Sequence, residues 1–137
     1  MRLLLVNWQD IENPQAGGAE IHLHEIFGRL ARRGHEITLL CGGWPGSPPR
    51  ARIDGMSIHR VGTRQSFAGL GYPYFNRQLR AQAWDLVVED TNKVPLYTPL
   101  WTRDRTMALV PHLFGGTAFL VLPAPLAAAV GLCARPL

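Results

Sequence analysis

The sequence predicts an α/β fold in which helices cover both faces of a parallel β-sheet. Residues 2–7 form a short apolar run without alternation, which is typical of a strand buried on both faces. A stretch with apolar residues at helical spacing follows, and then a β-branched and apolar run at 36–41. A strand, a helix and a strand in this order form a right-handed crossover unit, so the two strands are expected to be parallel.

The predicted helix follows Gly17 and Gly18 and ends near Arg33. Glu20 lies in its first turn and basic residues lie in its last turn, which suits the helix dipole. Gly34 is placed to take the left-handed conformation that often follows a helix. The apolar positions that define the buried face are Ala19, Leu23, Ile26, Phe27 and Leu30.

The elements that follow have weaker signals. Residues 42–55 are rich in Gly and Pro and are expected to form turns, and the alternation at 56–61 predicts a more exposed strand near a sheet edge. Residues 74–83 are rich in helix formers and lack Gly and Pro, which favours a helix. Short apolar runs at 85–89 and 107–110 predict two further buried strands.

The C-terminal segment carries almost no charge. From Thr106 to Ala134 no charged residue occurs other than a protonated His112. Residues 113–134 are long enough to span a bilayer, but Gly115, Gly116, Pro123 and Pro125 divide them, so we favour a loop followed by a helix at 125–134. Such a helix would be apolar on all sides and would need cover from another domain, a partner or a lipid surface.

Composition narrows the class of protein. The chain has 137 residues, 47% hydrophobic and 18% charged, which fits one globular domain and excludes a disordered chain. The net charge of +4 comes from scattered basic residues, which argues against a nucleic-acid surface and suits anionic phosphate ligands or an acidic membrane surface. Cys41 and Cys133 lie far apart, so we expect neither a disulfide framework nor a zinc site, and a reducing cytoplasm fits best. The apolar run at the N-terminus is too short for a signal peptide.

Candidate functional residues follow the strands, because ligands bind beyond the carboxyl ends of strands in open parallel sheets. The pair Gly17 and Gly18 would expose backbone amides and a positive helix end to an anion, and a tight turn explains the same pair equally well. Neither GxGxxG nor GxxxxGK[ST] occurs, which disfavours a dehydrogenase and a P-loop enzyme.

Titratable side chains give fewer clear signals. His112 follows a predicted strand and could donate to substrate oxygens, or could have a structural role. Glu89 and Asp90 are adjacent in a strand, so their side chains should point to opposite faces and cannot act as a carboxylate pair. His22, His24 and Glu25 lack metal-binding spacing, and we expect them on a solvated helix face.

Four segments together resemble a known family: RLLLVNW, PQAGGAEIHLHEIFGRLARRGHEITLLCG, DLVVEDTNKVPLYTPL and ALVPHLFGGTAF. They resemble the N-terminal domain of GT-B glycosyltransferases, specifically the retaining family 4. The resemblance covers residues 1–119, and its most specific part is the block from GGAE to RRGHEITLL. Residues 120–137 lie beyond it as an apolar segment, either a loop plus helix or a truncated connection.

The resemblance implies a Rossmann-like acceptor domain, one half of a GT-B fold, that faces a second domain holding most of the nucleotide-sugar. It also implies metal-independent sugar transfer without a cofactor, in glycan biosynthesis, to a glycan, lipid or small-molecule acceptor. His112 would contact the transferred sugar as the catalytic candidate, and Gly17 and Gly18 would lie near the donor diphosphate or the acceptor. The residues expected beside the acceptor pocket are Glu89, Asp90 and Asn92.

Two hypotheses follow. In the first, the chain is the acceptor-side half of a cytoplasmic glycosyltransferase, with peripheral membrane contact compatible with its charge, and it is inactive without a donor domain. In the second, it is a non-enzymatic α/β module that docks a partner or a membrane through residues 120–137. The second reading gives Gly17, Gly18 and His112 purely structural roles.

Overall fold

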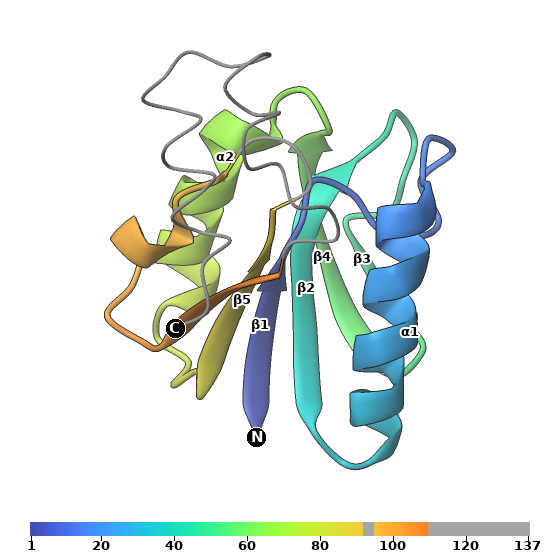
Figure 1. The fold of residues 1–137 in the computed structure, drawn as a ribbon. Coiled ribbons are helices and arrows are strands. Elements are labelled where there is room, and N and C mark those ends of the chain that lie inside the picture. Colours follow the sequence, from blue (N-terminus) through green and yellow to red (C-terminus); the bar gives the residue numbers. More distant parts are fainter. Residues whose placement is uncertain (92–94, 110–137) are drawn as a thin grey trace, which may run out of the picture.

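The structure is a computed structural model, and it describes residues 1–91 and 95–109 (Figure 1). A six-stranded sheet has the order β3-β4-β2-β1-β5-β6. All neighbouring strands are parallel except β3, which pairs antiparallel with β4. The strands are β1 (Arg2–Val6), β2 (Glu36–Gly43), β3 (Arg50–Ile53), β4 (Met56–Thr63), β5 (Leu86–Asp90) and β6 (Thr106–Leu109).

Helices lie on both faces of this sheet, as the sequence predicts. Helix α1 (Gly18–Arg32) packs on one face, and helix α2 (Phe67–Tyr74) with the π-helical turn η1 (Phe75–Leu79) packs on the other (Figure 1). A short 3-10 turn, η2 (Thr98–Leu100), precedes β6. The Rossmann-like α/β prediction is therefore confirmed.

The first crossover unit matches its sequence signals closely. β1 and β2 are parallel and in register from Arg2 opposite Glu36 to Val6 opposite Leu40. Helix α1 ends at Arg32, and Gly34 has φ +98°, the left-handed conformation expected after the helix.

Alternation along the central strands divides the core into two layers. Leu3 and Leu5 of β1 pack under α1 with Phe27, whereas Leu4 and Val6 pack under α2. Each of these β1 side chains is at most 4% exposed. A strand with apolar residues on both faces is what the unbroken run at 2–7 predicts.

The prediction for residues 42–55 is partly wrong, because this stretch contains β3. Asp54 and Gly55 both have positive φ, 53° and 81°, and form a tight hairpin turn between β3 and β4. The predicted strand at 56–61 exists as β4 and lies near the sheet edge as predicted, next to the edge strand β3, but most of its first half is buried and not exposed. Its partner β3 has only four residues, and the Gly/Pro-rich stretch that precedes β3 favours the prediction of turns.

The predicted helix at 74–83 is also displaced. Helix α2 begins at Phe67, and the helical structure ends with η1 at Leu79, where the amide of Arg80 donates to the Phe75 carbonyl 2.8 Å away. Glycines and Pro73 in α2 lower its helix propensity. Tertiary packing overrides that preference, because Phe67 is fully buried against the sheet.

The last two predicted strands are confirmed as β5 and β6, which are parallel neighbours. The predicted helix at 125–134 and the domain boundary at residue 119 lie outside the described residues. None of the helices in residues 1–91 and 95–109 is both long and apolar enough to cross a membrane.

Gly42 provides a test of packing at the end of β2. A Cβ atom there would lie 2.7 Å from the Thr63 carbonyl oxygen and 2.9 Å from the Trp8 carbonyl oxygen. Both atoms belong to backbone, so Gly42→Ala should destabilise the fold by about 1–3 kcal/mol through overpacking. Chemical denaturation measures this loss.

Gly69→Ala in α2 is the matched control, because a Cβ atom there has nothing within 4 Å. It should leave stability unchanged or raise it by about 0.5–1 kcal/mol, since alanine favours the helix. Equal destabilisation by both substitutions would contradict the packing described for Gly42.

Candidate functional site at the carboxyl edge of the sheet

The carboxyl ends of the parallel strands gather several polar segments. The loop of residues 7–17 runs from β1 to α1, and residues 44–49 connect β2 to β3. Thr91 follows β5, and its amide donates to the Leu109 carbonyl of β6 at 2.8 Å. In open parallel sheets, ligands bind at this edge.

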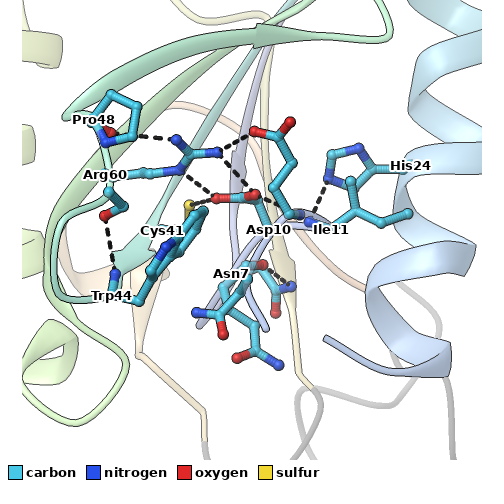
Figure 2. A network of polar contacts seen from close by, with 12 residues as sticks. Asn7, Asp10, Ile11, His24, Cys41, Trp44, Pro48 and Arg60 are labelled. Atoms are coloured by element: carbon cyan, nitrogen blue, oxygen red, sulfur yellow. Dashed lines mark hydrogen bonds and ion pairs between the residues drawn. The ribbon is translucent and has the colours of Figure 1, made fainter. Parts of the chain in front are cut away.

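A buried ion pair anchors the β1–α1 loop (Figure 2). The Arg60 guanidinium of β4 donates to both carboxylate oxygens of Asp10, at 2.7 and 3.1 Å. The two side chains are 2% and 0% exposed. Arg60 also donates to Glu12 at 2.8 Å and to the Pro48 carbonyl at 3.3 Å. The hydrogen bond with Asp10 raises the pKa of Arg60, so the guanidinium stays charged.

Cys41 and Trp44 complete this cluster. The Cys41 thiol donates to Asp10 at 3.5 Å, and burial raises the pKa of that thiol well above its usual value. The Arg60 guanidinium carbon lies 4.5 Å from the centroid of the Trp44 ring. Arg60 therefore links β4, the β1–α1 loop and the β2–β3 connection at one point.

Gly17 and Gly18 are exposed at the N-terminus of α1, where the sequence predicts them. The Gly17 amide donates to the Glu20 carboxylate at 2.8 Å, and Glu20 is itself 2% exposed. A Cβ atom at Gly18 would meet nothing within 4 Å, so packing does not require a glycine there. The structure thus leaves open space beside Gly18, whereas the Gly17 amide is already hydrogen-bonded to the Glu20 carboxylate.

Asp90 lies close to this helix end, on the α1 side of the sheet. Val88, two residues earlier, packs in the layer under α1, and Asn7 follows Val6, which pairs with Glu89. The side-chain amide nitrogen of Asn7 donates to the Gln9 carbonyl at 2.8 Å and to the Glu20 carboxylate at 3.4 Å. Asn7 and Asp90 therefore stand at the same level of neighbouring strands.

Several buried polar atoms at this edge of the sheet have no hydrogen-bond partner among the described residues. They are both carboxylate oxygens of Asp90, Oδ1 of Asn7 and Oγ1 of Thr91. Burial, with a smaller contribution from the nearby Glu20 charge, raises the pKa of Asp90 from 3.8 to about 7. Perturbed carboxyl groups of this kind are typical of functional sites.

Glu89 faces the opposite side of the sheet, as its alternation with Asp90 predicts. Its carboxylate accepts from the Thr98 amide at 3.1 Å, from the Thr98 hydroxyl at 2.9 Å and from the Leu96 amide. These bonds hold Leu96 and Thr98, the first residue of η2. The structure does not bring Glu89 together with Gly17, Gly18 and Asp90.

The expectation that His22, His24 and Glu25 share a solvated face is wrong for His24, which is 3% exposed. Its Nε2 accepts from the Ile11 amide at 3.3 Å (Figure 2), and its Nδ1 lies 3.4 Å from the Asp54 carboxylate. His24 therefore connects the β1–α1 loop to the β3–β4 turn. Burial lowers the pKa of His24 despite Asp54. In the described part of the chain, no group of three or more His, Cys, Asp or Glu residues could hold a metal ion.

Comparison with known protein families identifies the kind of domain to which this sheet belongs. The model of Glycosyltransferase Family 4 matches residues 16–115, most of the chain. The chain belongs to glycosyltransferase family 4. The sheet and its helices form the N-terminal α/β domain of a GT-B-type glycosyltransferase. The comparison with curated proteins finds no match.

Two of the family 4 site residues predicted from the sequence, Asn92 and His112, lie outside the described residues. Sequence reasoning missed Asn7, Thr91 and the Asp10–Arg60 pair. Asn7 and Thr91 directly follow strands, a position that signals the ligand edge. Asp10 and Arg60 give no such signal, because 50 residues separate them.

Loss of Arg60 should destabilise this family 4 domain strongly. Arg60→Met leaves the buried Asp10 carboxylate without its counter-ion, a change that costs about 3–5 kcal/mol. Arg52→Met on exposed β3 is the control and should change stability by at most about 0.5 kcal/mol. Adding Asp10→Asn to Arg60→Met should recover part of the loss in urea denaturation, and a purely additive loss would argue against the pair.

Asp90 should make stability depend on pH. Between about pH 4 and 7 the folded state keeps a proton that the unfolded state has released, so the Asp90 contribution to stability falls as the pH rises through this window. Asp90→Asn lacks this dependence. The stability of the variant relative to the original chain should therefore rise from pH 4 to pH 7 and level off above it.

Urea denaturation of both chains across this range measures the difference. His24 and His59 act in the opposite direction, because burial lowers their pKa values and stability falls when the pH drops. Their effects cancel in the difference between the two chains. A difference that does not change with pH would show that Asp90 is ionised in the folded protein.

Proposed function

We propose that this chain is the acceptor-side domain of a retaining glycosyltransferase that transfers a sugar from a nucleotide-sugar to an acceptor hydroxyl. The observation that carries the proposal is the pair of buried neighbouring residues Asp90 and Asn7, here called the Asp90 cluster, at the carboxyl edge of a family 4 domain. Its polar atoms lack partners among the described residues, and a polyhydroxylated ligand offers both donors and acceptors. Buried polar groups of this kind require partners to offset the cost of their desolvation.

In the proposed reaction, the acceptor oxygen bonds to the anomeric carbon of the donor sugar as the bond from that carbon to the phosphate oxygen breaks. The departing nucleoside diphosphate takes the hydroxyl proton. Asp90 would bind and orient the acceptor, since a carboxyl group with a pKa near 7 can accept or donate a hydrogen bond near neutral pH. Fixed orientation of two reactants lowers the barrier by removing entropy loss from the chemical step.

The remaining roles follow from the family. His112 would contact the transferred sugar, and Asn92 would lie beside the acceptor, with Glu89 supporting the neighbouring loop through its bonds to Thr98. The open space beside Gly18 would admit the donor diphosphate or the acceptor. No metal or cofactor enters this scheme.

The proposal includes a second domain that binds most of the nucleotide-sugar, because closure of two walls around the substrates is what excludes water. It also places the reaction in the cytoplasm, which a buried free thiol at Cys41 supports. The non-enzymatic alternative rests on residues 120–137, which lie outside the described residues.

Reconstitution tests the proposed function. The chain is mixed with the donor-side domain of a family 4 enzyme, and the release of nucleoside diphosphate from UDP-, GDP- and ADP-sugars is measured with pooled glycosides as acceptors. Release should require both domains. Asp90→Asn should lower the rate at least tenfold, about the effect of losing a hydrogen bond to a charged group.

Glu25→Gln, on the exposed face of α1, is the matched acidic control and should act like the original chain. The proposal fails if no nucleotide-sugar gives transfer with any donor domain, or if Asp90→Asn transfers at the original rate.

A further inference from the structure

A pocket of about 380 Å³ opens at the carboxyl edge of the sheet. Asp90 and Asn7 are not among the residues that line it. Its walls come from the loops that follow β1, β2 and β4. The volume lies in the lower part of the range for small-molecule sites, about 300–1,000 Å³. Other cavities of the described chain open beside Arg2 and Met1, near the amino ends of the strands, where ligands of such sheets rarely bind.

The lining of this pocket combines apolar surfaces with amide groups. Its apolar part is Trp44 with Pro14 and Pro45, and its polar part includes Gln15, Arg64 and Gln65. We call it the Trp44 pocket.

Trp44 is held in place before any ligand arrives. Its amide donates to the Ser47 hydroxyl at 3.0 Å, and its carbonyl accepts from the Ser47 amide at 2.9 Å. Arg60, itself fixed by Asp10, lies over the ring but is not among the residues that line the pocket (Figure 2). The pocket is thus lined by Trp44 but not by the guanidinium that lies over its ring, and a side chain that is already held in place loses little entropy on binding.

One exposed hydrogen bond joins two residues of the polar lining. Arg64 donates to the Gln15 side-chain oxygen at 3.2 Å. Because that oxygen already accepts a bond, the NH₂ end of the Gln15 amide is the one that can donate to a ligand hydroxyl. The pocket lining therefore combines amide and guanidinium donors with an aromatic residue.

We propose that the Trp44 pocket binds one pyranose ring of a carbohydrate acceptor. A pyranose has an apolar face of C–H groups and a rim of hydroxyl groups. The partly positive C–H groups pack on the electron-rich face of an aromatic ring, as cations do, and the hydroxyl groups bond to amides.

Charge favours a sugar ring over a nucleotide in this pocket. Among the described residues that line it, Arg64 is the one charged side chain, and Gln15 already accepts from it. A nucleoside diphosphate carries several negative charges, which one partly engaged guanidinium does not balance. The acidic side chain of Glu12 also lies close by, bound to Arg60 beside Trp44.

This inference rests on the proposed function, because it names the acceptor of that transfer as a carbohydrate. The loop that supplies Pro14 and Gln15 continues directly into Gly17 at the start of α1. A sugar bound at Trp44 would therefore extend the acceptor site from the Asp90 cluster along the same edge. Trp44 and Gln15 become specificity-determining residues for the acceptor.

Binding is tested on the 137-residue chain by ¹⁵N NMR titration with methyl pyranosides of glucose, galactose, mannose and N-acetylglucosamine and with their disaccharides. At least one sugar should shift the Trp44 indole and Gln15 side-chain signals in a saturable way. Trp44→Leu and Gln15→Leu should each raise its Kd at least tenfold, and Trp44→Phe should retain most of the affinity. Tyr72→Leu changes an exposed aromatic outside the pocket and should have no effect.

The spectra of the variants show directly whether each one is folded, and Gln15→Leu leaves the Arg60–Trp44 contact in place. The inference is overturned if no sugar shifts these signals, if the two Leu variants bind as well as the original chain, or if UDP, GDP or ADP saturates the pocket instead.

The reconstituted transfer assay separates this inference from the proposed function. Transfer with an unchanged acceptor KM in Trp44→Leu would overturn the Trp44 pocket and leave the proposed function intact. Sugar binding at Trp44 without transfer by any pair of domains would overturn the proposed function and the assignment of the bound sugar as its acceptor. A raised KM with an unchanged kcat would support both.

Discussion

The arrangement of the carboxyl edge depends on one buried ion pair, between Arg60 and Asp10. The loop from β1 to α1 is long and polar, so hydrophobic burial alone cannot hold it. A guanidinium that donates to both oxygens of a carboxylate specifies direction as well as distance. Through this pair, β4 positions the loop that leads to the N-terminus of α1, and the same guanidinium supports the Trp44 ring.

The two adjacent carboxyl groups of β5 show how strand alternation separates structure from function. Glu89 has three hydrogen-bond donors from residues 96–98 and fastens Leu96 and the first residue of η2. Asp90, on the other face, is buried near Glu20 without a partner among the described residues. The Glu89 carboxylate therefore stabilises the fold, and the Asp90 carboxylate keeps its hydrogen-bonding capacity for a ligand.

The sequence predicted most of the sheet because local signals and burial agree there. The apolar runs of β1, β2, β5 and β6 and the amphipathic pattern of α1 each carry their own evidence. β3 was missed because it has only four residues and follows a Gly/Pro-rich stretch, and α2 was missed because two glycines and Pro73 lower its helix propensity, so contacts with other elements decide both conformations. The site follows the same division: Gly17, Gly18 and Asp90 could be found from their places after strands, whereas the Trp44 pocket could not.

By itself, the sequence determined the fold class, the first crossover unit and the family, since each depends on residues close together in the chain or on the order of segments along it. Only the tertiary structure decided that Asp10 pairs with Arg60, that Glu89 and Asp90 have different partners, and that Trp44 joins Gln15 and Arg64 in one pocket. The physical reason is that such contacts depend on the order of strands in the sheet. That order brings side chains from distant parts of the chain to one edge, and local periodicity carries no information about it.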